Sequence, residues 1–377
     1  MALASEVVLD GLTLTLEDVE RVALDLSVRV RLSDEAAERM VASRNFIEEL
    51  VETGEPVYGV TTGFGRLADV AVAPDEREAL QRNLVRSHAS GVGSPMDRAS
   101  VRALMLLRAN ALARGNSGCR VLVVEQLLEL LNAGIHPRVP EFGSVGASGD
   151  LGPLAHVALG LLGEGLAEYS GDEQLVETAM ATEGIAPLTL GSKEGLALIN
   201  GTQATTGLGL LALRAAERAV EVAEVAGAMS LEALLGTPEP FRKEIHEARP
   251  HKGQGISASR LRTLLADSEI RASHQEDDPR VQDAYSLRCM PQVHGAAREA
   301  LGYVRGILEV EANSATDNPL VFPSAEVVVS GGNFHAQIVA QALDLLTIAI
   351  TDLASISERR IERMLNPDLS IGLPAFL

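Results

Sequence analysis

Ten residues near the middle of the chain, 143–152, constrain its fold more than any other stretch. Their sequence, GSVGASGDLG, carries four glycines, which permit positive φ angles and close approach of neighbouring backbone. Two prolines precede the stretch, and an apolar pattern with helical spacing follows it over residues 151–162. The stretch therefore predicts a tight loop that leads directly into a helix.

The centre of this loop, Ala147-Ser148-Gly149, has the composition that a chain needs to react with itself. Gly149 offers an unhindered amide nitrogen, Ala147 a carbonyl with little bulk beside it, and Ser148 a hydroxyl that can leave as water. Cyclisation of the Gly149 nitrogen onto the Ala147 carbonyl carbon, with dehydration of Ser148, would give a ring with an exocyclic methylidene. Such a group is an electrophile that no ordinary side chain supplies. A plain turn is the alternative that the stretch alone leaves open.

Three well-known loop motifs do not match this stretch. It lacks the Gly-Lys-Ser/Thr of a phosphate-binding P-loop, and Val145 stands where the dinucleotide-binding pattern needs a glycine. Asp150 occupies the last glycine position of a nucleophile elbow. No nucleotide site is therefore predicted.

The composition indicates a mainly helical protein. Only 3% of the 377 residues are aromatic and none is Trp, so the core must be built from Leu, Val, Ala and Ile, which suits helices better than sheet sandwiches. The formal net charge of −20 argues against nucleic acid or an anionic membrane as a partner. The longest apolar run, residues 336–356, is interrupted by Gln and Asp side chains and predicts a buried bundle helix instead of a membrane span.

The cysteines and histidines give no sign of a metal site. Cys119 and Cys289 lie far apart in sequence without a CxxC partner, and no histidine pair has zincin spacing. A disulfide framework is likewise not expected. Because the N-terminus has no basic-then-apolar signal pattern, we expect a cytoplasmic protein.

We expect an N-terminal domain over residues 1–200, which carries the central loop and Tyr58, and a long-helix bundle over 201–377. A small hairpin or irregular excursion is expected within residues 165–190, and a second hairpin within 320–330. Residues 236–284 are polar and predict an exposed connecting region with one helix, over about 257–267. The strongest helical patterns cover residues 33–53, 98–114, 117–133, 204–235 and 291–310.

Several residues outside the central loop have side chains suited to chemistry. Tyr58 lies on a glycine-spaced loop, residues 57–65, where it could serve as a general acid or base or simply anchor the loop. His88 comes at a predicted helix end, where it could also interact with the last carbonyls. Asn200 interrupts a helical pattern and is expected to be a junction residue.

Two further groups lie in the C-terminal half of the chain. Gln282, Tyr285 and Arg288 would share one face if their segment is helical, although an exposed polar face is the plainer interpretation. Phe334 comes at a helix start, where a core role is expected.

In this order, these segments resemble the aromatic amino acid lyase family, most closely its histidine ammonia-lyase branch. The Ser87-His88 pair is the one expected of that branch. The resemblance covers essentially the whole chain, and its matching segments are residues 58–65, 83–88, 143–154, 198–202, 282–288 and 332–335.

The resemblance implies an all-α long-helix bundle assembled as a homotetramer, whose active sites take residues from three subunits. It implies that Ala147, Ser148 and Gly149 form 4-methylidene-imidazol-5-one (MIO) autocatalytically, with no metal and no nucleotide. The implied reaction is the non-oxidative deamination of L-histidine to trans-urocanate and ammonia, the first step of histidine degradation.

The resemblance also implies a role for each matching residue. Tyr58 corresponds to the catalytic base, and Arg288 to the residue that clamps the substrate carboxylate with its planar fork. Asn200 and Tyr285 correspond to residues that hold the electrophile and assist its chemistry. The substrate pocket would be lined by His88, Gln282 and Phe334, with His88 near the imidazole.

Two alternatives stay open within this resemblance. A tyrosine or phenylalanine ammonia-lyase, or an aminomutase, would have the same fold. Family members also continue past the position of Leu377 to a glutamate that contacts the substrate imidazole, so we expect a C-terminally shortened chain. A catalytically impaired helical scaffold is therefore the second alternative.

Overall fold

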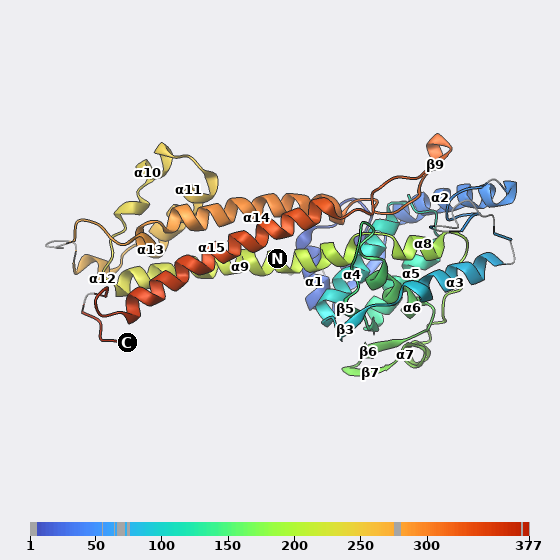
Figure 1. Ribbon diagram of the computed structural model, residues 1–377, viewed down its shortest axis with the longest axis horizontal. Helices are drawn as coiled ribbons and strands as arrows, with labels where there is room; N and C mark the ends of the chain where they lie inside the picture. Colours follow the sequence, from blue (N-terminus) through green and yellow to red (C-terminus); the bar gives the residue numbers. More distant parts are fainter. Residues whose placement is uncertain are drawn as a thin grey trace. The chain divides into compact units, whose positions relative to one another are not determined.

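The computed structural model describes residues 6–54, 56–63, 65, 72–73, 76–274, 280–370 and 372–376. The chain is mainly helical, as the composition predicts, with short strands between the helices (Figure 1). It divides into two compact units, the first comprising Met1–Leu211 and Leu308–Ala340 and the second Ala212–Ile307 and Gln341–Leu377. The units thus alternate along the sequence, and the division expected after residue 200 stays a prediction.

The first unit is built around α4 (Arg98–Ala113), whose side chains are nearly all buried because Ala and Leu occur on every face of the helix. Helices α1 and α5 pack against it. The other helices of this unit surround these three or connect its small sheets. The helices besides α4 are α1 (Leu16–Leu24), α2 (Asp34–Thr53), α3 (Arg77–His88), α5 (Val121–Ala133), α6 (Leu151–Leu161), α7 (Val176–Glu183), α8 (Glu194–Ile199) and the start of α9 (Gln203–Ala233).

Among the described residues, four small sheets complete the first unit. The strands β6 (Leu166–Tyr169) and β7 (Asp172–Leu175) form the first predicted hairpin, with β4 (His136–Pro137) alongside. The second predicted hairpin is β8 (Leu320–Phe322) and β9 (Val327–Val329), joined by the 3-10 turn η4 (Pro323–Ala325).

The remaining two sheets pair strands from distant parts of the chain, which the sequence did not predict. The strands β1 (Glu6–Leu9) and β2 (Arg29–Leu32) run parallel, with Glu6 opposite Arg29 and Leu9 opposite Leu32. The strands β3 (Val92–Pro95) and β5 (Pro140–Phe142) run antiparallel. Because these strands have only three or four residues each, they carry too little periodicity to be recognised.

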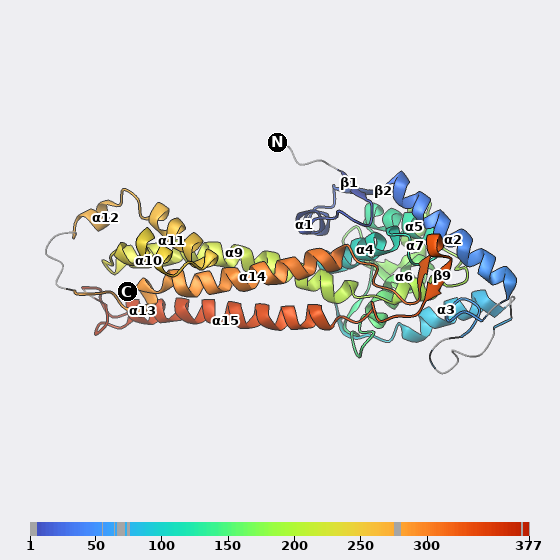
Figure 2. The same cartoon turned by 90° about the horizontal axis from the view of Figure 1, so that it is seen from above.

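The second unit consists of long helices with a group of short ones. The later part of α9, α14 (Met290–Ala312) and α15 (Gln337–Leu365) run alongside one another in both views (Figures 1 and 2). The predicted helix at 257–267 is α11 (Lys252–Leu264), and residues 275–279 of the predicted connecting region lie outside the described part of the chain. The short elements not predicted from the sequence are η3 (Glu239–Phe241), α10 (Lys243–Ala248), α12 (Glu269–Ala272) and α13 (Tyr285–Arg288).

Apolar packing and ion pairs hold the second unit together. Leu231, Phe241, Leu261 and Met290 are fully buried in one cluster that joins α9, α11 and α14. Glu224 of α9 is also fully buried; it accepts hydrogen bonds from the Arg298 guanidinium of α14 and forms an ion pair with a guanidinium of α11.

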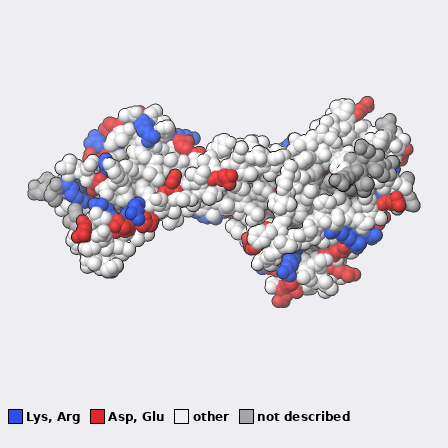
Figure 3. Space-filling model, in the orientation of Figure 1, with Lys and Arg blue, Asp and Glu red and all other residues white. Residues whose placement is uncertain are grey.

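Helix α15 is less buried than expected. Within its most apolar window only 22% is buried, and Ile348 and Ile361 are each more than half exposed. By length and composition alone, α15 and the segment Glu194–Ala233 are each apolar enough to cross a membrane, although the latter is 78% buried. Figure 3 shows few charged side chains along the middle of the long helices. The prediction of a buried helix is therefore wrong for α15, because no other described segment covers this apolar stripe.

Candidate active site

The central loop is tight and leads directly into a helix, as predicted. The Val145 N–H donates to the Gly149 carbonyl at 2.9 Å, which closes the loop, and Gly146 has a φ of +77° that disfavours other residues. A Cβ at Gly152 would come within 2.7 Å of the Gly143 carbonyl oxygen. Glycine is thus required where the loop returns past the start of α6.

Asp150 anchors the loop and was not selected from the sequence. It is fully buried and accepts hydrogen bonds from the Ser144 hydroxyl (2.7 Å) and from the Thr205 N–H and hydroxyl (both 2.8 Å). Burial raises the pKa of the Asp150 carboxyl, and the hydrogen bonds from Thr205 and Ser144 oppose this shift. The only sequence signal was its position directly after Gly149.

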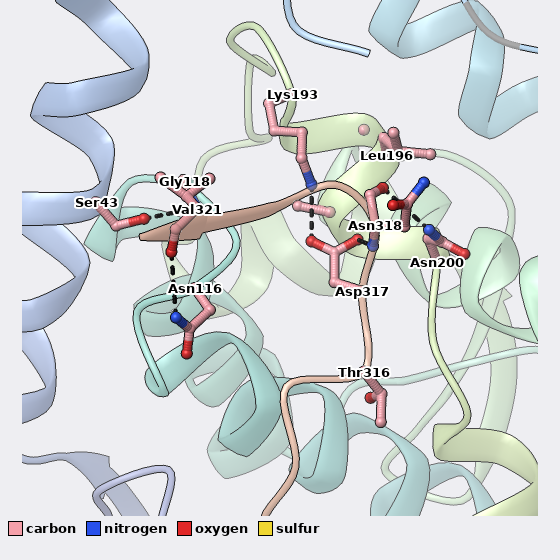
Figure 4. Close-up of polar contacts among 12 residues, drawn as sticks. Ser43, Asn116, Gly118, Lys193, Leu196, Asn200, Thr316, Asp317, Asn318 and Val321 are labelled. Carbon is pink, nitrogen blue, oxygen red and sulfur yellow. Dashed lines mark hydrogen bonds and ion pairs between the residues drawn. The ribbon is translucent and has the colours of Figure 1, made fainter. Parts of the chain in front are cut away.

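Ser148 and Asn200, predicted separately, come together in the structure. The Ser148 hydroxyl donates to Asn200 Oδ1 at 2.7 Å, and Asn200 Nδ2 donates to the Asn318 carbonyl at 3.1 Å. Asn200 directly follows α8 and is 5% exposed, so the prediction of a junction residue is confirmed. Figure 4 shows its side-chain amide turned towards Asn318.

The residues of the loop fit the self-formed electrophile. Ala147 is exposed, and Ser148 and Gly149 are half-buried, so the reacting atoms are not enclosed by core packing. A Cβ at position 149 would come within 3.1 Å of the Ser144 hydroxyl oxygen, a tight contact that glycine avoids. The Ser148 hydroxyl, which would leave as water, already donates a hydrogen bond to the Asn200 amide oxygen. Within the described residues, no group of three His, Cys, Asp or Glu side chains could hold a metal ion.

His88 is the last residue of α3, and its ring is oriented by that helix. Nδ1 lies 2.9 Å from the Leu84 carbonyl oxygen and 3.1 Å from the Ser87 hydroxyl. Because a carbonyl only accepts, Nδ1 carries the proton in the neutral ring and Nε2 is the acceptor nitrogen. The expected interaction with the last carbonyls is confirmed, and it fixes the tautomer that a ligand would meet.

Tyr58 lies half-buried on a compact turn of the first unit. The turn is closed by hydrogen bonds from the Val60 and Thr61 N–H groups to the Val57 carbonyl, and Gly59 has a φ of +67°. Val60 is buried in a small apolar cluster that secures the turn to α2 and β8. Phe64 of the predicted loop lies outside the described residues.

Phe334 also belongs to the first unit but is not a core residue. It lies half-buried in a turn before α15, where the His335 N–H donates to the Gly332 carbonyl at 2.9 Å. The core role expected for Phe334 is therefore wrong, because the helix begins three residues later, at Gln337.

The second unit holds Gln282, Tyr285 and Arg288. Helix α13 begins at Tyr285, so the expected helical face shared with Gln282 is wrong, and Gln282 lies exposed before the helix. Tyr285 is 73% exposed, and the Arg288 guanidinium lies over its ring, 4.5 Å from the centroid. Arg288 Nε is buried without a hydrogen-bond partner among the described residues.

The candidate residues therefore form two groups. Tyr58, His88, Ser148, Asn200 and Phe334 belong to the first unit, and the other three belong to the second. Within the first unit, a direct hydrogen bond joins Ser148 to Asn200.

Comparisons with known proteins identify the family of this chain. The profile of the aromatic amino acid lyase family matches residues 14–377. A histidine ammonia-lyase of Caldanaerobacter subterraneus subsp. tengcongensis is 51% identical over 372 residues, which span 99% of this chain and 72% of that relative. One of Anaeromyxobacter dehalogenans is 54% identical over 377 residues, covering 98% of this chain and 74% of the relative.

Solved structures that match this chain share its fold. The crystal structure of histidine ammonia-lyase from Trypanosoma cruzi matches with a TM-score of 0.89 and 44% identity, over 98% of this chain and 69% of that one. A tyrosine aminomutase from Streptomyces globisporus matches with a TM-score of 0.91 and 42% identity, over 98% and 73%. The family profile, the sequence relatives and the shared fold together show that the chain belongs to the aromatic amino acid lyase family.

Proposed function

We propose that this chain carries the catalytic residues of a histidine ammonia-lyase, which releases ammonia from L-histidine and leaves trans-urocanate. The relatives that carry this name are about half identical to it in sequence. The hydrogen bond between the Ser148 hydroxyl and Asn200 Oδ1 carries the proposal, because it holds the one hydroxyl that cyclisation must remove. Ala147, Ser148 and Gly149 would together form MIO, which supplies an electron-poor carbon for the substrate amine.

We assign a role to each remaining candidate. His88 would present its acceptor Nε2 to a protonated imidazole nitrogen of the substrate, since Nδ1 is bound to Leu84. Arg288 would bind the substrate carboxylate with two parallel hydrogen bonds. Tyr58 would accept the β-proton, with Tyr285 assisting, and Gln282 and Phe334 would line the pocket.

The proposal is tested in two steps on the purified protein. Cyclisation and dehydration remove two waters, so the intact mass should be about 36 Da below that of the unmodified chain. Addition of L-histidine should then produce the ultraviolet absorbance of urocanate. An intact mass equal to the unmodified chain in folded protein would contradict the proposal at its first step.

A second candidate is a tyrosine or phenylalanine ammonia-lyase or an aminomutase. Its support is the tyrosine aminomutase structure, which matches as well as the histidine ammonia-lyase one. Assays with L-histidine, L-tyrosine and L-phenylalanine separate the candidates, and β-amino acid products would identify an aminomutase. His88→Leu should lose L-histidine as a substrate selectively, while Ser148→Ala should lose every substrate.

We also propose that the protein assembles with itself in the cytoplasm as a homotetramer. The apolar stripe of α15 and the exposed Tyr285 are surfaces that further copies could cover. Light scattering at several concentrations tests this, with a monomer at all concentrations as the contrary result. A protein that carries the mass loss but produces no urocanate at high concentration would be the impaired scaffold.

A further inference from the structure

A fully buried ion pair joins the start of α8 to the segment before β8. Lys193 Nζ donates to Asp317 Oδ2 at 2.7 Å, and the two side chains are 0% and 2% exposed (Figure 4). Removing two charges from water opposes folding strongly, so a buried pair of this kind contributes little net stability compared with apolar residues. Stability is therefore a weak reason for a lysine and an aspartate at these positions.

The pair is connected to Asn200 through the backbone of one residue, Asn318. Asp317 Oδ1 accepts the Asn318 N–H at 2.6 Å, while Oδ2 is held by Lys193. The carbonyl of the same Asn318 accepts a hydrogen bond from Asn200 Nδ2. The Asn318 side chain is held as well, because its Oδ1 accepts the Gly331 N–H at 2.7 Å.

This connection decides which way the Asn200 amide faces. A carbonyl oxygen can only accept, so the amide nitrogen of Asn200 must point to Asn318 and the amide oxygen must point to Ser148. If the backbone at Asn318 turned its carbonyl away, the amide could rotate and present its NH₂ to the serine hydroxyl. Asn200 would then donate to the hydroxyl instead of accepting from it.

The neighbouring segments are fixed by other contacts. The fully buried Arg108 donates to the Thr316 carbonyl at 3.2 Å and to the Ala197 carbonyl of α8. Asn116 bonds to both backbone groups of Val321. Between these anchors, the Asp317 side chain has Lys193 as its charged partner, and Lys193 immediately precedes α8, which ends at Asn200.

We propose that the buried Lys193–Asp317 pair is a positioning device that orients the Asn200 amide so that its oxygen faces the Ser148 hydroxyl. The inference rests on the proposed function, in which this hydroxyl is lost during ring formation. The pair acts through Asn318 and Asn200 and does not touch the reacting atoms. Its removal should therefore slow ring formation out of proportion to any loss of stability.

The test is a time course of intact mass after refolding from denaturant, started from protein that was produced unfolded and still has the mass of the unmodified chain. The double variant Lys193→Met/Asp317→Leu removes both charges together, so neither is left unpaired in the core. We expect the loss of about 36 Da to be at least about tenfold slower than in the wild type. The single variant Asp317→Ala should be at least as slow and less stable, since it leaves the lysine buried alone.

The matched control is Glu224→Gln, which removes another fully buried, ion-paired carboxylate in the second unit. It should lower the melting temperature yet form the ring at the wild-type rate. A double variant that matures as fast as the wild type would overturn the inference alone. A wild type that never loses the mass would overturn the proposed function and the inference with it.

Discussion

The two groups of candidate residues differ in how firmly the chain holds them. In the first unit, Asn200 is 5% exposed and has a partner for both ends of its amide, and Asp150 is enclosed by three hydrogen bonds. In the second unit, Tyr285 is 73% exposed, and its contact with Arg288 is a stacked guanidinium. The residues proposed to form the electrophile are thus held by hydrogen bonds within one chain, whereas the second-unit residues proposed to act on the substrate lie exposed or half-buried.

The largest effect is expected at Ser148, where the proposed ring would form. Ser148→Ala removes the only hydroxyl that ring formation can expel, so turnover of L-histidine should fall by roughly 10³-fold or more. The intact mass should equal that of the unmodified chain. The hydroxyl is half-buried with one partner, so the fold should be preserved, which circular dichroism can verify. Substantial urocanate production by this variant would show that the electrophile lies elsewhere.

Asn200→Ala tests whether the hydrogen bond between Ser148 and Asn200 contributes to ring formation. It leaves the Ser148 hydroxyl and the Asn318 carbonyl without their partner, and such a loss costs about 1–3 kcal/mol, or roughly 5- to 150-fold in rate. Ring formation, followed by intact mass, should slow by that amount. Thr205→Val is the comparison, because it removes a hydrogen bond to Asp150 on the other side of the same loop. Equal rates for Asn200→Ala and the wild type would remove Asn200 from the maturation step.

A smaller effect is expected in the second group, and on binding only. Arg288→Lys keeps the charge but loses the planar fork, so KM for L-histidine should rise about tenfold, since a charge-assisted hydrogen bond contributes roughly 1.5 kcal/mol. The mass loss of ring formation should be unchanged. If this variant instead failed to mature, the division into a rigid ring-forming group and an open substrate group would be wrong.

The sequence predicted the two groups unequally, for a physical reason. Local features are readable: the glycines of the central loop, the helical patterns and the Asn200 junction were all identified. Asp150 and the Lys193–Asp317 pair were missed, because their role depends on burial and on partners up to 124 residues away. The helical face that was expected to join Gln282 to Arg288 failed because helix boundaries a few residues apart cannot be read from periodicity.

The last expected effect concerns two buried histidines, one in each unit, and it bears on stability and not on turnover. Burial, with the nearby Arg102, lowers the pKa of His136 in the first unit from 6.5 to about 4. Burial, with the nearby Arg360 and Arg298, lowers the pKa of His294 in the second unit to about 3. His136 Nε2 contacts the Arg102 guanidinium at 3.0 Å, whereas neither ring nitrogen of His294 has a hydrogen-bond partner among the described residues.

These shifts should make both units lose stability as the pH falls below 6.5. The second unit should lose stability over a wider pH range. A histidine that is neutral when folded takes up a proton on unfolding below pH 6.5, so stability present above that value is lost as pH falls towards the folded pKa. Each contributes up to about 1.4 kcal/mol per pH unit. His294→Leu should flatten the fall in unfolding free energy between pH 6.5 and 4, measured by urea titration. His251 is exposed in the same unit, so His251→Gln is the control. If the unfolding free energy of His294→Leu fell with pH as steeply as that of the wild type, His294 would not be the source of the acid sensitivity.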